Sequence, residues 1–147
     1  METIRIIIAD ENQDVLIGAP ISLSKDESLK VVATTTDEGE LYTLCNELKP
    51  DVVIATPELI IQSNIESIRN RIDGYDTKII AFGNISSKDT KKLLEIGIDG
   101  FMPYDASDDE LVKIVRIIHE GFYSVVASHI QGRINDMACG RGQPAYV

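Results

Sequence analysis

Short apolar runs alternate with helix-forming segments along most of this chain, and this alternation limits what the chain can fold into. The apolar runs are Ile4–Ala9, Leu29–Thr34, Val52–Ala55, Lys78–Phe82 and Gly100–Met102. Runs that are apolar at nearly every position are typical of parallel strands buried on both faces. Strands that alternate with helices favour an α/β fold, in which helices cover a mostly parallel sheet.

The segments between these runs carry apolar residues at helical spacing. The expected helices cover about residues 13–24, 37–48, 65–74, 86–96 and 107–118. Pro20 lies inside the first helix and should kink or loosen it. Ser107 and Glu110 form a capping box at the start of the last helix. Five strand–helix units in this length predict a doubly wound, flavodoxin-like sheet of five parallel strands, in the order 2-1-3-4-5 with helices on both faces.

The 147 residues suit one domain, which we expect to span 1–124. Residues 125–147 are expected to form a short helix over Val125–Gln131 and a flexible tail. The net charge of −10 argues against binding of nucleic acid through this chain. The apolar runs are far shorter than the about 20 residues that span a bilayer, and the N-terminus lacks a signal-peptide pattern. We therefore expect a cytoplasmic protein.

Polar residues follow the first and third strands, at the sheet edge where α/β proteins bind ligands. Asp10 and Glu11 follow the first strand, and Thr56 follows the third. The two carboxylates either bind Mg²⁺ weakly or form a solvated acidic cluster, and Glu58 is a candidate third ligand. The hydroxyl of Thr56 is either modified by a kinase or satisfied by a neighbouring group.

Several motifs in order resemble one family. They are Ile6–Glu11, Pro50–Ile54, Asp76–Ala81, Glu95–Phe101 and Tyr104–Leu111. Together they closely resemble the receiver domain (CheY-like) of bacterial two-component response regulators of the NarL/LuxR type, over about residues 3–130. Each motif alone is weak, whereas their order and spacing together are specific.

The resemblance implies a phosphorylation site in which a strand-3 aspartate accepts a phosphoryl group from a histidine kinase. In that family two acidic residues help to hold Mg²⁺, and a Ser/Thr and a Lys contact the phosphoryl oxygens. Asp10 and Glu11 match the acidic pair. Thr56 stands at the phosphoacceptor position, Gly83 at the hydroxyl position and Tyr104 at the lysine position.

Each of these three departures removes one step of phosphoryl transfer. A threonine hydroxyl is a poor nucleophile without an adjacent base, and no cation remains at position 104. The resemblance therefore implies a pseudo-receiver without enzymatic activity or a cofactor other than weakly bound Mg²⁺. Phe101 matches the aromatic switch residue of the family. The ring of Tyr104 either fills the vacated phosphate pocket or points to solvent.

The last predicted helix carries more apolar residues than one buried face needs. Leu111, Ile114, Val115 and Ile118 are expected to face the sheet, whereas Val112 and Ile117 fall outside that stripe. The candidates for a homodimer interface are Leu111, Val112, Val115 and Ile117. The alternative is that the segment 125–131 covers them. Receivers commonly pair through their fourth and fifth or first and fifth helices, so we expect partners to be a second copy, other signalling proteins or an output domain.

The favoured function is a phosphorylation-independent interaction module in two-component signal transduction. A phospho-switch that modifies Thr56 is a second hypothesis. A third is a cofactor-binding enzyme, although the loop at residues 10–13 lacks the small hydroxyl residues that a flavin phosphate needs. A fourth is the N-terminal regulatory domain of a LuxR-type DNA-binding transcription regulator, because the family that this chain resembles also carries a C-terminal helix-turn-helix. The chain has no room for that domain, so we expect either a stand-alone receiver or a part of a longer regulator.

Overall fold

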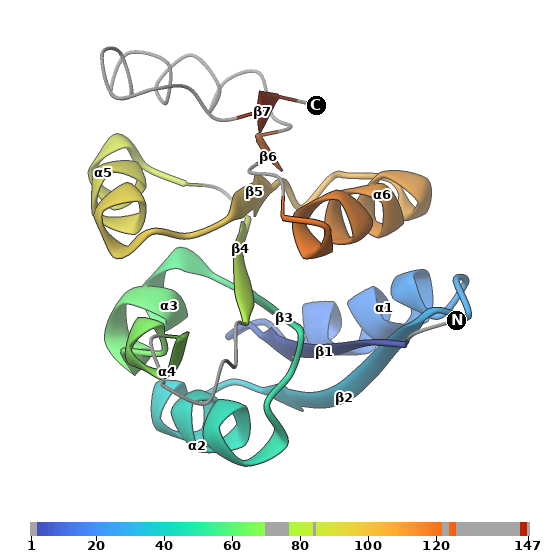
Figure 1. Ribbon diagram of the computed structural model, residues 1–147, viewed down its shortest axis with the longest axis horizontal. Helices are drawn as coiled ribbons and strands as arrows, with labels where there is room; N and C mark the ends of the chain where they lie inside the picture. Colours follow the sequence, from blue (N-terminus) through green and yellow to red (C-terminus); the bar gives the residue numbers. More distant parts are fainter. Residues whose placement is uncertain (1–2, 70–76, 84, 122–123, 126–144, 147) are drawn as a thin grey trace.

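The computed structural model describes residues 3–69, 77–83, 85–121, 124–125 and 145–146 (Figure 1). Their strands form one parallel sheet in the order β2-β1-β3-β4-β5-β6-β7. The strands are β1 (Ile4–Ala9), β2 (Leu29–Thr35), β3 (Val52–Ala55), β4 (Lys78–Phe82), β5 (Gly100–Met102), β6 (Ser124–Val125) and β7 (Ala145–Tyr146). The predicted order 2-1-3-4-5 is confirmed, and two short strands extend the sheet beyond it.

Helices lie on both sides of this sheet (Figure 1). They are α1 (Gln13–Leu23), α2 (Glu38–Leu48), α3 (Pro57–Ser63), α4 (Glu66–Arg69), α5 (Ser87–Ile96) and α6 (Asp108–His119). Helices α1 and α6 pack on one face, whereas α2, α3 and α5 pack on the other. Helix α1 continues through Pro20 as a single helix.

Two apolar cores, one on each face, explain why the strands read as continuous apolar runs. Ile6 and Ile8 of β1 belong to the core beneath α1 and α6. Ile7 and Ala9 of the same strand belong to the core beneath α2, α3 and α5. Successive side chains of a strand point to opposite faces, so a strand covered on both sides needs apolar residues at every position.

The helix after β3 begins earlier than the sequence predicts. Helix α3 starts directly after the strand because Thr56 caps it and Pro57 occupies its first turn, where a missing N–H is harmless. Asn64 ends this helix in the left-handed conformation, with φ of 58°. The short helix α4 then covers the start of the predicted 65–74 helix, and residues 70–74 lie outside the described part of the chain.

The prediction of a helix over Val125–Gln131 is wrong at Val125. Val125 belongs to β6 and pairs with Phe101 of β5. Residues 126–131 lie outside the described residues, as does most of the predicted tail. Nowhere in the described chain does a helix reach the length and hydropathy needed to cross a membrane.

Candidate functional site

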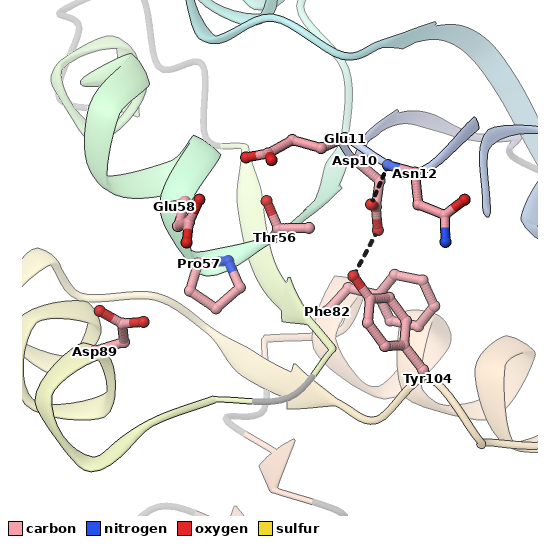
Figure 2. A pocket seen from close by; sticks show the side chains of 9 residues that line it. All are labelled: Asp10, Glu11, Asn12, Thr56, Pro57, Glu58, Phe82, Asp89 and Tyr104. Atoms are coloured by element: carbon pink, nitrogen blue, oxygen red, sulfur yellow. Dashed lines mark hydrogen bonds between the residues drawn. The ribbon is translucent and has the colours of Figure 1, made fainter. Parts of the chain in front are cut away.

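The carboxyl ends of β1, β3 and β4 and the loop after β5 meet around one cavity of about 250 Å³ (Figure 2). The lining residues are Asp10, Glu11, Asn12, Thr56, Pro57, Glu58, Phe82, Asp89 and Tyr104. Four of them are acidic, and none of these described lining residues is lysine, arginine or histidine. The cavity therefore repels anions.

Asp10 is the buried centre of this site, with only 2% of its surface exposed. Its Oδ1 accepts a hydrogen bond from the backbone N–H of Asn12 at 2.8 Å. Its Oδ2 accepts a hydrogen bond from the hydroxyl of Tyr104 at 2.9 Å (Figure 2). Its own backbone N–H donates to the carbonyl of Thr35. Both carboxylate oxygens thus have protein partners, which explains how the acid tolerates burial.

Glu11 and Glu58 are exposed carboxylates at the opening of the cavity. A hydrogen bond with Glu58, and secondly the negative charge of Glu58, raise the pKa of Glu11 above its ordinary value. Two carboxylates that share a site favour protonation of one of them. A cation at this place would relieve the repulsion between them.

Thr56 has a structural role in this site. Its Oγ1 accepts a hydrogen bond from the backbone N–H of Leu59 at 3.4 Å and so caps α3. Its backbone N–H donates to the carbonyl of Ala9 at 3.2 Å, which continues the strand pairing. Among the described lining residues there is no lysine, arginine or histidine beside the hydroxyl to hold the charge of a phosphoryl group.

Gly83 and Tyr104 are in direct contact, so the residue at one position limits the other. Gly83 has φ of +115°, and a Cβ added there would lie 2.7 Å from both Cε2 and Cζ of Tyr104. The Tyr104 ring also packs edge-on against Phe82, with centroids 4.7 Å apart and planes at 77°. Partial burial and the hydrogen bond to Asp10 raise the pKa of Tyr104 far above its ordinary value. The ring reaches into the cavity, although 44% of the residue stays exposed.

These residues do not fit a Mg²⁺ site. Both oxygens of Asp10 already accept hydrogen bonds, one from the backbone N–H of Asn12 and one from the hydroxyl of Tyr104. The described residues contain no group of three or more His, Cys, Asp or Glu side chains able to hold a metal ion. Mg²⁺ requires near-octahedral oxygen ligands, which two or three loosely placed carboxylates do not supply.

Known proteins resemble this chain over most of its length, although no family model matches it. The transcriptional regulatory protein LnrK of Bacillus subtilis is 28% identical over 120 residues, which is 80% of this chain and 54% of LnrK. The oxygen regulatory protein NreC of Staphylococcus haemolyticus is 29% identical over 120 residues, which is 80% of this chain and 55% of NreC. The chain thus spans about half the length of the curated relatives it matches.

Solved structures with a similar fold are also response regulators. The receiver domain of the response regulator NarL from Mycobacterium tuberculosis has a TM-score of 0.71 at 20% identity, covering 82% of this chain and 99% of that domain. The chain has the fold of a response-regulator receiver domain. A LuxR-family two-component response regulator from Aurantimonas gives a TM-score of 0.74 at 24% identity, covering 94% of this chain and 99% of that one. Salmonella enterica RcsB, solved bound to a promoter with a phosphomimetic, gives 0.75 at 20% identity, covering 95% of this chain and 70% of RcsB.

Other predicted site residues of this receiver fold lie away from the cavity. Phe101 is fully buried in the core beneath α2, α3 and α5. Leu111 and Val115 are also buried, at 6% and 0% exposure, so their assignment to an interface is wrong. They face the sheet because they occupy the inward stripe of α6. Val112 and Ile117 are half-buried, and Val112 packs at the margin of the same core.

Among the described residues, the most exposed large apolar side chains are on α1, and the sequence interpretation missed them. Ile17 and Ile21 are 64% and 62% exposed. They stand four residues apart and off the inward stripe of α1, which is the pattern that should have revealed them. Beside α1 lies a groove of about 400 Å³ between this helix and the start of α6, lined in part by Gly18, Phe82 and Tyr104.

Proposed function

We propose that this chain is an atypical receiver domain of a NarL/LuxR-type response regulator that acts as a phosphorylation-independent interaction module in two-component signalling. The observation that carries the proposal is the hydrogen bond between Tyr104 and Asp10 inside the cavity. The family places a lysine and an acidic metal ligand at these two positions. Here the Tyr104 hydroxyl is hydrogen-bonded to the Asp10 carboxylate, so neither side chain is free to take part in phosphoryl binding.

The position of Thr56 supports the same proposal. Its hydroxyl accepts a hydrogen bond from the start of α3. The acidic side chains around it make the cavity unfavourable for an incoming phosphoryl donor. A phosphoryl group has little to bind it here, because its oxygens need cations or hydrogen-bond donors.

Incubation with acetyl phosphate and Mg²⁺, followed by intact-mass measurement, tests the proposal. We expect no added phosphoryl group on the native chain. A matched control is the triple variant Thr56→Asp, Gly83→Ser, Tyr104→Lys, which restores the three residue types of the family and should gain mass. A phosphoryl adduct on the native chain would refute phosphorylation independence, whatever residue carried it.

We also propose that the module forms a homodimer through the side where α1 and α6 lie together. The exposed Ile17 and Ile21 of α1 and the half-buried Val112 and Ile117 of α6 support this surface. Ile17→Glu and Ile117→Glu should each give a later elution volume on a sizing column than the native chain. Native elution at the monomer volume would contradict the proposal.

A second candidate function is the regulatory domain of a LuxR-type DNA-binding transcription regulator. It is favoured because the relatives are about twice as long as the matched segment and LnrK is named a transcriptional regulatory protein. Sequencing the gene downstream of the codon for Val147 tests it. We expect a helix-turn-helix coding region there if this candidate is correct, and a stop codon would exclude it.

A further inference from the structure

We propose that the hydrogen bond between Tyr104 and Asp10 is a built-in latch, which holds the loop between β5 and α6 (residues 103–107) in one conformation without any phosphoryl group. Gly83 is a required part of the latch, because the Tyr104 ring occupies the space that a side chain there would fill. This inference rests on the proposed function, since it supplies the means by which a receiver without phosphorylation keeps a single state.

The acceptor of the latch is rigid. Asp10 is almost fully buried, its Oδ1 is held by the N–H of Asn12, and its backbone N–H is held by Thr35. The bond joins residues 94 positions apart in the chain, so it ties the end of β1 to the loop between β5 and α6. A hydrogen bond to an ionised carboxylate is stronger than one between neutral groups.

The position of the donor ring is equally constrained. Ring atoms Cε2 and Cζ lie 2.7 Å from where a Cβ of residue 83 would be, and the N–H of Gly83 donates to the carbonyl of Met102 at 2.9 Å. Phe82 packs against the ring edge-on. The ends of β4 and β5 therefore form the space in which the ring packs, and only glycine at position 83, which has no Cβ, leaves room for the ring.

The latch reaches the surface of the molecule through the loop. The turn after Tyr104 is closed by the N–H of Ala106, which donates to the carbonyl of Pro103 at 3.3 Å, and Ser107 then caps α6. Tyr104 and Phe82 line both the acidic cavity and the groove beside α1. Asn12 also lines both spaces, so Tyr104 is one of three residues on their shared boundary, and its position affects the shape of both.

Hydrogen exchange of the whole chain, followed amide by amide, tests the latch. In Tyr104→Phe, which removes only the hydroxyl, the amides of Gly83 and Ala106 should exchange about tenfold faster than in the native chain. Tyr42→Phe is the matched control, because Tyr42 is an exposed tyrosine on α2, away from the cavity. Unchanged exchange of these amides in Tyr104→Phe would overturn the proposal.

A second variant tests the role of Gly83. Gly83→Ala should displace the ring and accelerate exchange in the same loop, although the tyrosine hydroxyl is still present. Gly97→Ala is the control, because Gly97 also has positive φ, of +88°, but has nothing within 4 Å of an added Cβ. Normal loop exchange in a folded Gly83→Ala protein would contradict the latch.

The two proposals fail in different ways. A phosphoryl adduct on the native chain would refute the proposed function, even if Tyr104→Phe loosens the loop. Native exchange in the Tyr104→Phe loop would refute the latch, even if the native chain never accepts phosphate. Measuring mass and exchange on the same samples, with and without acetyl phosphate, separates these outcomes.

Discussion

Replacement of Gly83 by alanine should destabilise the protein more than the same change at Gly18, Gly39, Gly97 or Gly121. Two effects add at this position. A non-glycine residue held at φ of +115° is strained by about 1–2 kcal/mol. The new Cβ would also stand 2.7 Å from the Tyr104 ring, which must move and give up its hydrogen bond to Asp10.

The magnitude follows from these parts. Loss of a hydrogen bond to a charged group costs about 1.5–3 kcal/mol, and partial exposure of Tyr104 places this site at the lower end. Alanine also reduces the entropy of the unfolded chain, which offsets about 0.4–1 kcal/mol. The net destabilisation of Gly83→Ala is therefore about 1.5–3 kcal/mol. Gly97→Ala has backbone strain only, and should lose about 1 kcal/mol.

Urea unfolding followed by circular dichroism measures these free energies, with unchanged m-values as a check on two-state behaviour. A Tyr104→Ala background supplies the decisive comparison. With the ring absent, Gly83→Ala should lose no more stability than Gly97→Ala does. Equal losses for Gly83→Ala in the native and Tyr104→Ala backgrounds would refute the reasoning, because the ring contact would then have no energetic effect.

Three further predictions concern ionisable groups. Glu58→Gln should lower the pKa of Glu11 toward its ordinary value. It should also raise the stability of the fold at neutral pH, because a raised pKa means that the ionised carboxylate is disfavoured in the folded state. An unchanged titration of the Glu11 carboxyl group by NMR would contradict this prediction. Ser28→Ala should raise the pKa of Asp26, which the side-chain hydrogen bond from Ser28 lowers most. The stability difference from the native chain should be present at neutral pH and vanish as the pH falls through the range where Asp26 is protonated, as measured by urea unfolding at several pH values. Burial raises the pKa of Cys45 to about 12, so iodoacetamide should label it only after unfolding, and rapid labelling of its peptide in the folded protein would count against this.

The strand order could be predicted because its signal is local and redundant. Ile7 and Ile8 of β1 point to opposite faces of the sheet, and both are apolar. This pattern indicates a strand covered on both sides, whichever helices cover it. The surface of α6 could not be predicted in the same way. The helical spacing of Leu111 and Val115 predicts that they face the sheet, and the structure confirms it, but the spacing does not show how far Val112 and Ile117, at the edge of this wide apolar arc, are covered.

The candidate site was predictable in its residues but not in their contacts. The order of motifs located Thr56, Gly83 and Tyr104 at three corresponding positions of one family. Nothing local in the sequence pairs Tyr104 with Asp10, because 94 residues separate them. The cap made by Thr56 had a local signal, since a threonine followed by a proline is a common helix start.

The contact between Gly83 and the Tyr104 ring also bears on the mutational routes that lead from this cavity to a phosphate-binding one. A serine or threonine at position 83 would place its Cβ 2.7 Å from the ring, so the tyrosine would have to move and give up its hydrogen bond to Asp10. Exchange of Tyr104 first removes the same partner of Asp10 before any hydroxyl has been gained. Either order of exchange loses this hydrogen bond at its first step, so each single exchange should give a less stable protein than the native chain.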